Sequence, residues 1–288
     1  MKAAIGAAAA LLLCGAAPAP KPEIAITIDD LPVHAPYPAG VTPLAVNRRM
    51  IAALKAGHVS VTAFVNAVNV KDADTMEALR EWRAAGFVLG NHTWSHPHLS
   101  ALTIPQFEEE LTKDEPLLEK LGGTSDWRWF RYPFLDEGKD EAQRVAARKV
   151  LASHGYRVAA VTMSFSDWAF TPAYARCMDK GDRSAVAELE RLYLQSAREN
   201  IAVSRDMAHK LYGRDIPYVL LMHVSAMSAH MMPQVIRLYR DAGFRLVSLP
   251  VAESDPAYAG YTDLRLAPPA PPQLASPDHS ARLNSICT

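Results

Sequence analysis

The sequence lacks features that would assign it to several large classes of protein. Basic and acidic residues nearly balance, at 30 and 31, so no basic excess is available to attract nucleic acid. After residue 20, no apolar run approaches the roughly 20 residues that a membrane-spanning helix needs. We therefore expect neither a nucleic-acid partner nor a transmembrane segment. The sequence predicts no oligomeric state.

Cysteine is also scarce, at 3 of 288 residues. Cys14 lies in the N-terminal leader, which leaves Cys177 and Cys287 as the pair that an oxidising compartment could join. Either these two form one disulfide that pins the end of the chain, or both stay free thiols. Residues 267–288 contain an APPAPP run and many polar residues, a composition that predicts a Pro-rich flexible C-terminal tail.

The N-terminus has the pattern of a secretory signal peptide, assigned to residues 1–17. Lys2 supplies a positive charge, Ala3 to Leu13 form a short apolar stretch, and small residues follow. This stretch is too short to span a bilayer. Leu13 is too large for the position before a lipidated cysteine, which disfavours a lipoprotein. We expect an exported protein, periplasmic or secreted.

From residue 22 to 266 the chain alternates short β-rich runs with longer amphipathic patterns. Expected strands cover residues 23–28, 60–65, 87–90, 128–130, 156–162, 218–222 and 244–249. Expected helices cover residues 43–56, 74–85, 104–120, 140–154, 183–210 and 233–242. Such alternation predicts an α/β fold in which about seven parallel strands form a closed or nearly closed barrel, in a single catalytic domain. Residues 169–182 are expected to form an inserted loop.

Polar residues follow five of the expected strands. They are Asp29 and Asp30, then Asn91, His92 and His96, then Arg131, then Asp167 and Trp168, and finally His223. The loops after the strands of a (β/α) barrel surround one common mouth, where catalytic groups converge. The sequence therefore predicts one active site built from all five loops.

A metal site is the chemistry that these residues favour. His92 and His96 are four apart in HTWSH, and a helical turn would place both rings on one face. Two imidazoles and the carboxylate of Asp30 make a catalytic zinc set with one open position. A bound divalent ion activates water near neutral pH, Asp29 would act as the general base, and His223 is the best general acid.

Plainer interpretations stand beside these. Arg131 could be a surface ion-pair residue, Trp168 an ordinary core residue and His223 a buried, hydrogen-bonded histidine. His34 and His98 lie near the expected site, but the sequence assigns them no role.

Five short motifs, TIDD, HTWSH, FRYPF, SDW and LLMH, resemble in order those of the polysaccharide deacetylase family, the NodB-homology domain of carbohydrate esterase family four. The resemblance runs from about Ile24 to Ser248. It implies a distorted (β/α) barrel and divalent-metal hydrolysis of N-acetyl or, in some members, O-acetyl groups.

The first three motifs imply the hydrolytic centre. Asp29 would be the base, and Asp30, His92 and His96 the metal ligands. Arg131 would orient the base.

The remaining roles concern the acetyl group and the proton donor. The backbone N–H of Phe134 would serve the oxyanion, and Asp167 would tether the arginine. Trp168 would line the acetyl pocket, Leu220 would lie beside the acetyl methyl, and His223 would be the general acid.

Three residues depart from the family pattern. Leu31 stands where glycine is usual, Ser164 where an acid usually precedes Asp167 by three residues, and Val224 where an acid commonly follows His223. The last change removes one orienting partner of His223. No expected metal ligand is lost.

The expected function is removal of acetyl groups from a polysaccharide, most simply from N-acetylglucosamine units of peptidoglycan or a chitin-like glycan. The expected cofactor is one divalent ion, with Zn²⁺ favoured and Co²⁺, Ni²⁺ and Mn²⁺ as alternatives. An O-acetyl xylan-type esterase and a non-catalytic carbohydrate-binding barrel are the competing functions.

Overall fold

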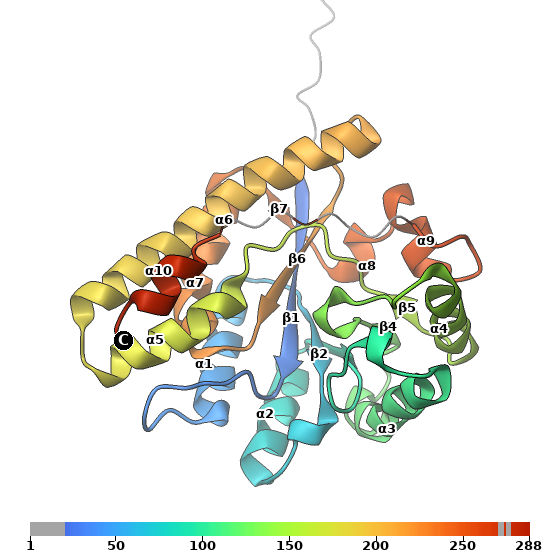
Figure 1. Cartoon of the computed structure of the whole chain (residues 1–288), viewed down its shortest axis with the longest axis horizontal. Helices are drawn as coiled ribbons and strands as arrows, with labels where there is room; N and C mark the ends of the chain where they lie inside the picture. Colours follow the sequence, from blue (N-terminus) through green and yellow to red (C-terminus); the bar gives the residue numbers. More distant parts are fainter. Residues whose placement is uncertain (1–20, 270–273, 275–277) are drawn as a thin grey trace, which may run out of the picture.

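The computed structural model describes residues 21–269, 274 and 278–288. Its centre is a sheet of seven parallel strands that curls into a barrel, with helices on the outside (Figure 1). The strands are β1 Glu23–Leu31, β2 Thr62–Val65, β3 Val88–Asn91, β4 Trp129–Phe130, β5 Arg157–Val158, β6 Tyr218–His223 and β7 Arg245–Leu246.

The strand order is β5-β4-β3-β2-β1-β6, and β7 pairs with the start of β1. Beyond β5 the chain returns to the other end of this order, where Met163 forms a bridge with Leu220 of β6. The N–H of Leu221 donates to the carbonyl of Met163 across a distance of 3.0 Å. The two ends of the sheet therefore meet, and the predicted distorted (β/α) barrel of about seven parallel strands in one domain is confirmed.

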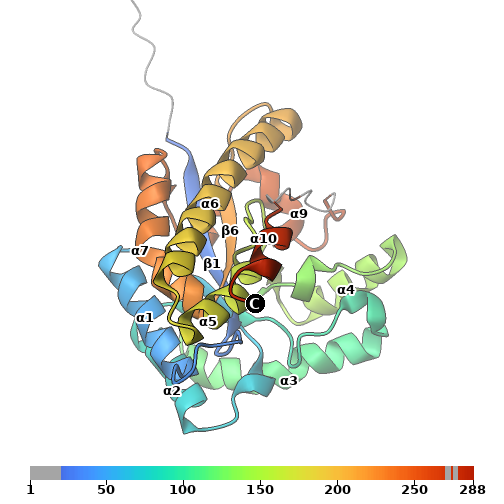
Figure 2. The same cartoon turned by 60° about the vertical axis from the view of Figure 1, so that its left-hand side comes forward.

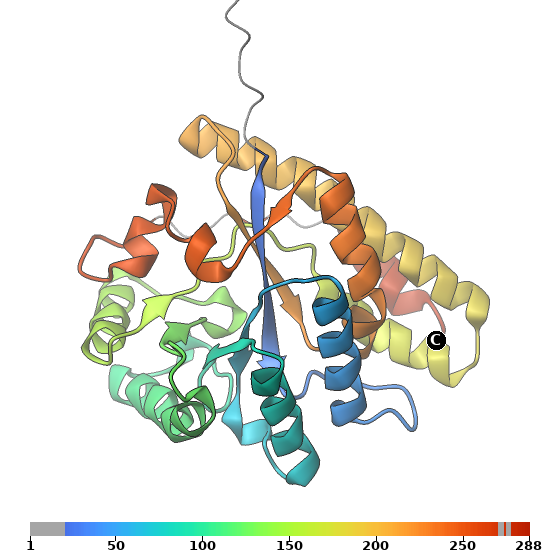
Figure 3. The same ribbon diagram turned by 180° about the vertical axis from the view of Figure 1, so that it is seen from behind.

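Helices cover the outside of the barrel. They are α1 Pro43–Ala56, α2 Ala73–Ala84, α3 Ile104–Gly122, α4 Glu141–Ser153, α5 Phe170–Asp179, α6 Arg183–Tyr212, α7 Ala226–Asp241, α8 Leu249–Ala252, α9 Ala259–Thr262 and α10 Ser280–Ser285. Helix α1 packs between α2 and α7, as the view from behind shows (Figure 3). The predicted bounds of α1 are confirmed. They could be predicted because a capping residue lies at each end of the helix. The Thr42 hydroxyl accepts from the N–H of Ala45, and Gly57 follows the last turn.

Two predictions about helices are wrong. The expected loop at residues 169–182 contains α5, because Phe170, Tyr174 and Cys177 recur at helical spacing and are all buried against the domain. Helix α7 begins seven residues before the expected Pro233, which lies inside it. The Ser225 hydroxyl caps the true start by accepting from the N–H of Ser228.

The last residues of the chain pack on the domain. Cys177 and Cys287 form a disulfide, so the first of the two alternatives for the cysteines holds. Leu283 and Ile286 are buried, and α10 lies beside α5 and α6 (Figure 2). The composition of residues 267–288 predicted a flexible tail, but residues 278–288 are anchored to the domain.

The expected signal peptide, residues 1–17, lies outside the described residues. Among the described residues, none of the helices is long and apolar enough to cross a membrane.

Candidate metal centre and active site

The two adjacent carboxylates come from the end of β1, where that strand carries an extra residue. Between Ile28 and Leu31 the pairing of β1 advances three residues while β2 advances two, from Ala63 to Val65. Such a bulge redirects side chains, and Asp30 takes a left-handed backbone conformation with φ 67°. As a result both Asp29 and Asp30 line one cavity of about 330 Å³, although neighbours on a regular strand point to opposite faces.

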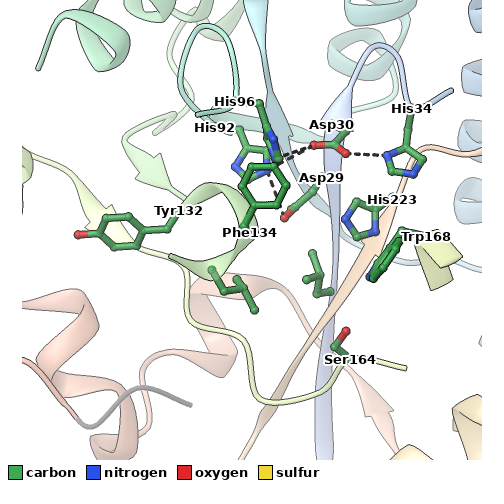
Figure 4. Close-up of a pocket in the computed structure, with 12 residues that line it drawn as sticks. Asp29, Asp30, His34, His92, His96, Tyr132, Phe134, Ser164, Trp168 and His223 are labelled. Carbon is green, nitrogen blue, oxygen red and sulfur yellow. Dashed lines mark hydrogen bonds and ion pairs between the residues drawn. The ribbon is translucent and has the colours of Figure 1, made fainter. Parts of the chain in front are cut away.

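His92 and His96 face Asp30 across this cavity (Figure 4). The predicted helical turn is wrong, because His92 directly follows β3 and His96 lies in a loop with left-handed residues at Thr93 and His96. This loop still brings the two rings together, with centroids 4.8 Å apart.

The ring of His92 is oriented by the backbone. Its Nδ1 lies 2.8 Å from the carbonyl oxygen of Arg131, and since a carbonyl only accepts, Nδ1 is the donor. Nε2 is therefore the nitrogen left with a lone pair for a metal. Burial lowers the pKa of His96 to about 4, helped by the neighbouring His92. At neutral pH this second ring is therefore uncharged, which is the form that binds metal.

The three expected ligands fit a divalent ion. The Nε2 atoms of His92 and His96 each lie 3.4 Å from Oδ1 of Asp30, and the three ligand atoms are all within 4.8 Å of one another. Ligand atoms bound about 2.0–2.2 Å from one tetrahedral zinc lie about 3.3–3.6 Å apart. Oδ1 of Asp30 is also buried without a hydrogen-bond partner among the described residues, which a bound cation would satisfy.

Asp29 lies beside this group and is held by Arg131. Nη1 of Arg131 is 3.3 Å from both carboxylate oxygens of Asp29. The guanidinium also donates to the carbonyl of Ala159 and the hydroxyl of Thr27, so a buried arginine reaches across the barrel from β4 to β1. The surface ion-pair interpretation of Arg131 is therefore wrong, and its contact with Asp29 is the one expected of an orienting residue.

Asp167 does not tether Arg131, contrary to expectation. Its Oδ1 lies 2.9 Å from Nδ1 of His223, and its Oδ2 accepts from the backbone N–H of His223 and the hydroxyl of Ser228, each at 2.8 Å. Asp167 therefore supplies the orienting acid that Val224 cannot.

The proton affinity of His223 follows from these contacts. Burial alone lowers the pKa of His223, but the charge and hydrogen bond of Asp167 oppose it, with smaller contributions from Asp30 and Asp29. The balance raises the pKa to about 9, so the ring carries a proton to donate at neutral pH.

Two large aromatic side chains flank the cavity. Trp168 is 53% exposed and Phe134 57% exposed, and both line the cavity. The core interpretation of Trp168 is thus wrong. Phe134 has a left-handed backbone, with φ 56°, and its ring contacts that of His96.

Leu220 is not beside this cavity, contrary to expectation. Leu221 lines it instead. Alternate residues of a strand share a face, so Leu221 points the same way as His223, and Leu220 points into the core, where its side chain is fully buried.

Sequence reasoning also missed His34. Its Nδ1 lies 2.6 Å from Oδ2 of Asp30, and its ring centroid lies 4.8 Å from that of His223. The available signal was its position four residues after Asp30, in the loop that leaves the same strand.

Comparisons with known proteins give a consistent result. A family model described as "Polysaccharide deacetylase" matches residues 16–159. The chain is 27% identical to the peptidoglycan-N-acetylmuramic acid deacetylase PdaA of Bacillus subtilis, over 46% of this chain and 45% of that relative. The chain spans between 33% and 56% of the length of the curated relatives it matches.

Solved structures share the fold. The chitin deacetylase of the fungus Colletotrichum lindemuthianum superposes with a TM-score of 0.56 at 18% identity, over 81% of this chain and 87% of that one. A CE4 family pseudoenzyme from Bacillus anthracis superposes with a TM-score of 0.58 at 17% identity, over 81% and 65%.

Proposed function

The chain belongs to the polysaccharide deacetylase family, and on this premise we propose that it is a metal-dependent hydrolase that removes acetyl groups from a polysaccharide. The observation that carries the proposal is the convergence of Asp30, His92 and His96 around one ion-sized space, beside Asp29 and opposite His223 (Figure 4). A purely structural or sugar-binding barrel has no need of this set.

Asp30, His92 and His96 would hold the ion. Two imidazoles and one carboxylate suit zinc first, and cobalt, nickel or manganese as alternatives. A divalent ion there would lower the pKa of water and polarise the acyl carbonyl.

The chain's own residues would handle the protons. Asp29, which Arg131 holds in place, would accept a proton from the attacking water. The oxygen of that water adds to the carbonyl carbon at the same time. The backbone N–H of Phe134 would donate to the oxygen that gains negative charge. His223 then donates its proton to the sugar nitrogen as the C–N bond breaks, which leaves acetate and a free amine.

Trp168 and Leu221 would bind the substrate. An exposed indole gives a sugar ring a flat apolar face. Leu221 offers the acetyl methyl group an apolar contact on the same face as His223.

The substrate we propose is a glycan with N-acetylglucosamine units, of the peptidoglycan or chitin type. An amine is a poor leaving group unless it is protonated, and a histidine with its pKa raised to about 9 suits that demand. The similarity to deacetylases that are named for peptidoglycan and chitin supports the same choice.

Acetate release tests the proposal. Purified protein loaded with Zn²⁺ is incubated with N-acetylglucosamine oligomers, with peptidoglycan fragments and with O-acetylated xylan oligomers. We expect release from the N-acetylated glycans that stops with a chelator and with Asp29→Asn. Faster release from xylan would identify an O-acetyl esterase instead, and sugar binding without any release would identify a binding barrel.

We also propose that the protein is exported, to the periplasm or the medium. The Cys177–Cys287 disulfide supports this, because such bonds persist in oxidising compartments. Cell fractionation, with intact-mass analysis of the recovered protein, tests it. A cytoplasmic protein that retains residues 1–17 would contradict it.

A further inference from the structure

His34 stands on the wall of the cavity opposite the two histidine ligands. It lies in the loop that leaves β1, and its side chain is 17% exposed. Figure 4 shows it next to Asp30, above His223 and Trp168, whereas His92 and His96 lie on the far side of Asp30. Among the described residues, its hydrogen bond to the proposed ligand set is the one to Asp30.

The hydrogen bond to Asp30 determines which oxygen of that carboxylate is free. Nδ1 of His34 lies 2.6 Å from Oδ2, and since a carboxylate oxygen accepts, Nδ1 donates. Oδ1 is then the oxygen that faces Nε2 of both His92 and His96 at 3.4 Å. With Oδ2 engaged by His34, Oδ1 is the oxygen of Asp30 that points at the ion-sized space.

The loop that carries His34 is itself anchored. The carbonyl of Pro32 accepts from the buried amide of Asn47 at 2.8 Å, and Asn47 accepts in turn from the indole N–H of Trp82. The backbone N–H of His34 donates to the hydroxyl of Tyr37 at 2.9 Å. The backbone that carries the imidazole is therefore held in place by α1 and by its own loop.

We propose that His34 is a positioning residue of the metal centre, which holds Asp30 through Oδ2 so that Oδ1 binds the ion. The inference rests on the proposed function only in taking Asp30, His92 and His96 as the ligands. Loss of a hydrogen bond that orients a metal ligand typically weakens metal affinity by about 10- to 100-fold. We expect that loss when the donor at position 34 is removed.

Two substitutions distinguish the effect of the hydrogen-bond donor of His34 from the effect of its aromatic ring. His34→Phe keeps an aromatic ring but has no donor, and His34→Asn keeps an N–H near the position of Nδ1 but has no ring. His154→Phe is the matched control, because His154 also pairs through Nδ1 with a carboxylate, that of Glu115 at 3.3 Å, at a partly buried site outside the cavity.

The measurement is the dissociation constant of Zn²⁺, obtained by competition with a chromophoric chelator on the purified full-length variants. The d–d absorption of Co²⁺ provides a second readout of the ligand geometry. Thermal unfolding of each metal-free variant checks that it is folded. We expect His34→Phe to bind Zn²⁺ about 10- to 100-fold more weakly, with His34→Asn and His154→Phe close to the unaltered protein.

Two results would overturn the role of His34 while leaving the proposed function intact. One is unchanged affinity in His34→Phe, and the other is an equal loss in His34→Phe and His34→Asn. The unaltered protein and His92→Gln report on the proposed function itself. If the unaltered protein binds no ion, or if His92→Gln binds as tightly, both the function and the role of His34 are wrong.

Discussion

Replacing Asp167 with asparagine tests the origin of the proton-donating character of His223. Asparagine keeps one oxygen that can accept from Nδ1 of His223, its amide nitrogen takes the place of Oδ2, and the negative charge is lost. Because the charge of Asp167 is the largest of the effects that raise this pKa, we expect the pKa of His223 to fall in Asp167→Asn.

The structure sets the size of the effect. The pKa of His223 lies at about 9 instead of 6.5, a difference that corresponds to about 3 kcal/mol between the two protonation states. Burial still opposes the charged ring after the substitution, so the pKa should return to 6.5 or below. At about pH 7.5, a ring with a pKa of 6.5 is protonated in only about a tenth of molecules, against nearly all at a pKa of 9.

Two assays report the protonation of His223. Imidazole NMR titration of the metal-free protein should show the pKa of His223 falling by about 2.5 units or more. In the Zn²⁺-loaded enzyme, the alkaline limb of kcat/KM should move to lower pH, with about a tenfold loss near pH 7.5 and partial recovery near pH 6. An unmoved limb, or an equal loss at every pH, would refute the assignment of Asp167 to His223.

Three further substitutions test other parts of the site and the fold. Asp29→Asn should lower kcat by about 10²- to 10⁴-fold while metal analysis still finds one ion per chain; loss of the ion would contradict the separation of base from ligand. Arg131→Met removes the guanidinium that pairs with the buried carboxylate of Asp29 and should cost about 3–5 kcal/mol in the free energy of unfolding, measured with urea. A cost below about 1 kcal/mol, as for an exposed ion pair, would contradict the structural role of this buried pair. Removing the disulfide by Cys177→Ser with Cys287→Ser releases a cross-link between residues 110 apart and should cost about 2–4 kcal/mol. Zn²⁺ affinity should not change in that variant, and a weakened site would show that the C-terminal segment supports the metal centre.

Much of the local structure could be predicted from the residues. The bounds of α1 follow from Thr42 at one end and Gly57 at the other. The alternation of strands and helices predicted the barrel, because parallel neighbours need helical crossovers. The positions of Asp29, Asp30 and His92 after their strands predicted a common site, since every parallel strand of a barrel ends at the same mouth.

Contacts between distant segments could not be predicted in this way. Asp167 is 56 residues before His223, and nothing in the SDW motif distinguishes His223 from Arg131 as its partner. That choice is made where the chain beyond β5 closes onto β6. The same is true of the cysteines, which pair only because α10 packs on α5.

The direction in which a strand side chain points was the other property that could not be predicted from the sequence. Leu220 and Leu221 are equally apolar, and a shift of one residue along a strand reverses the face on which each lies. Only the pairing of β6 with β1, which places His223 opposite Asp29, decides that Leu221 lines the cavity. Periodicity, caps and motif order are local properties and could be determined from the sequence. The meeting of His34 with Asp30 depends on a bulge, a left-handed residue and an anchored loop, which only the folded barrel supplies.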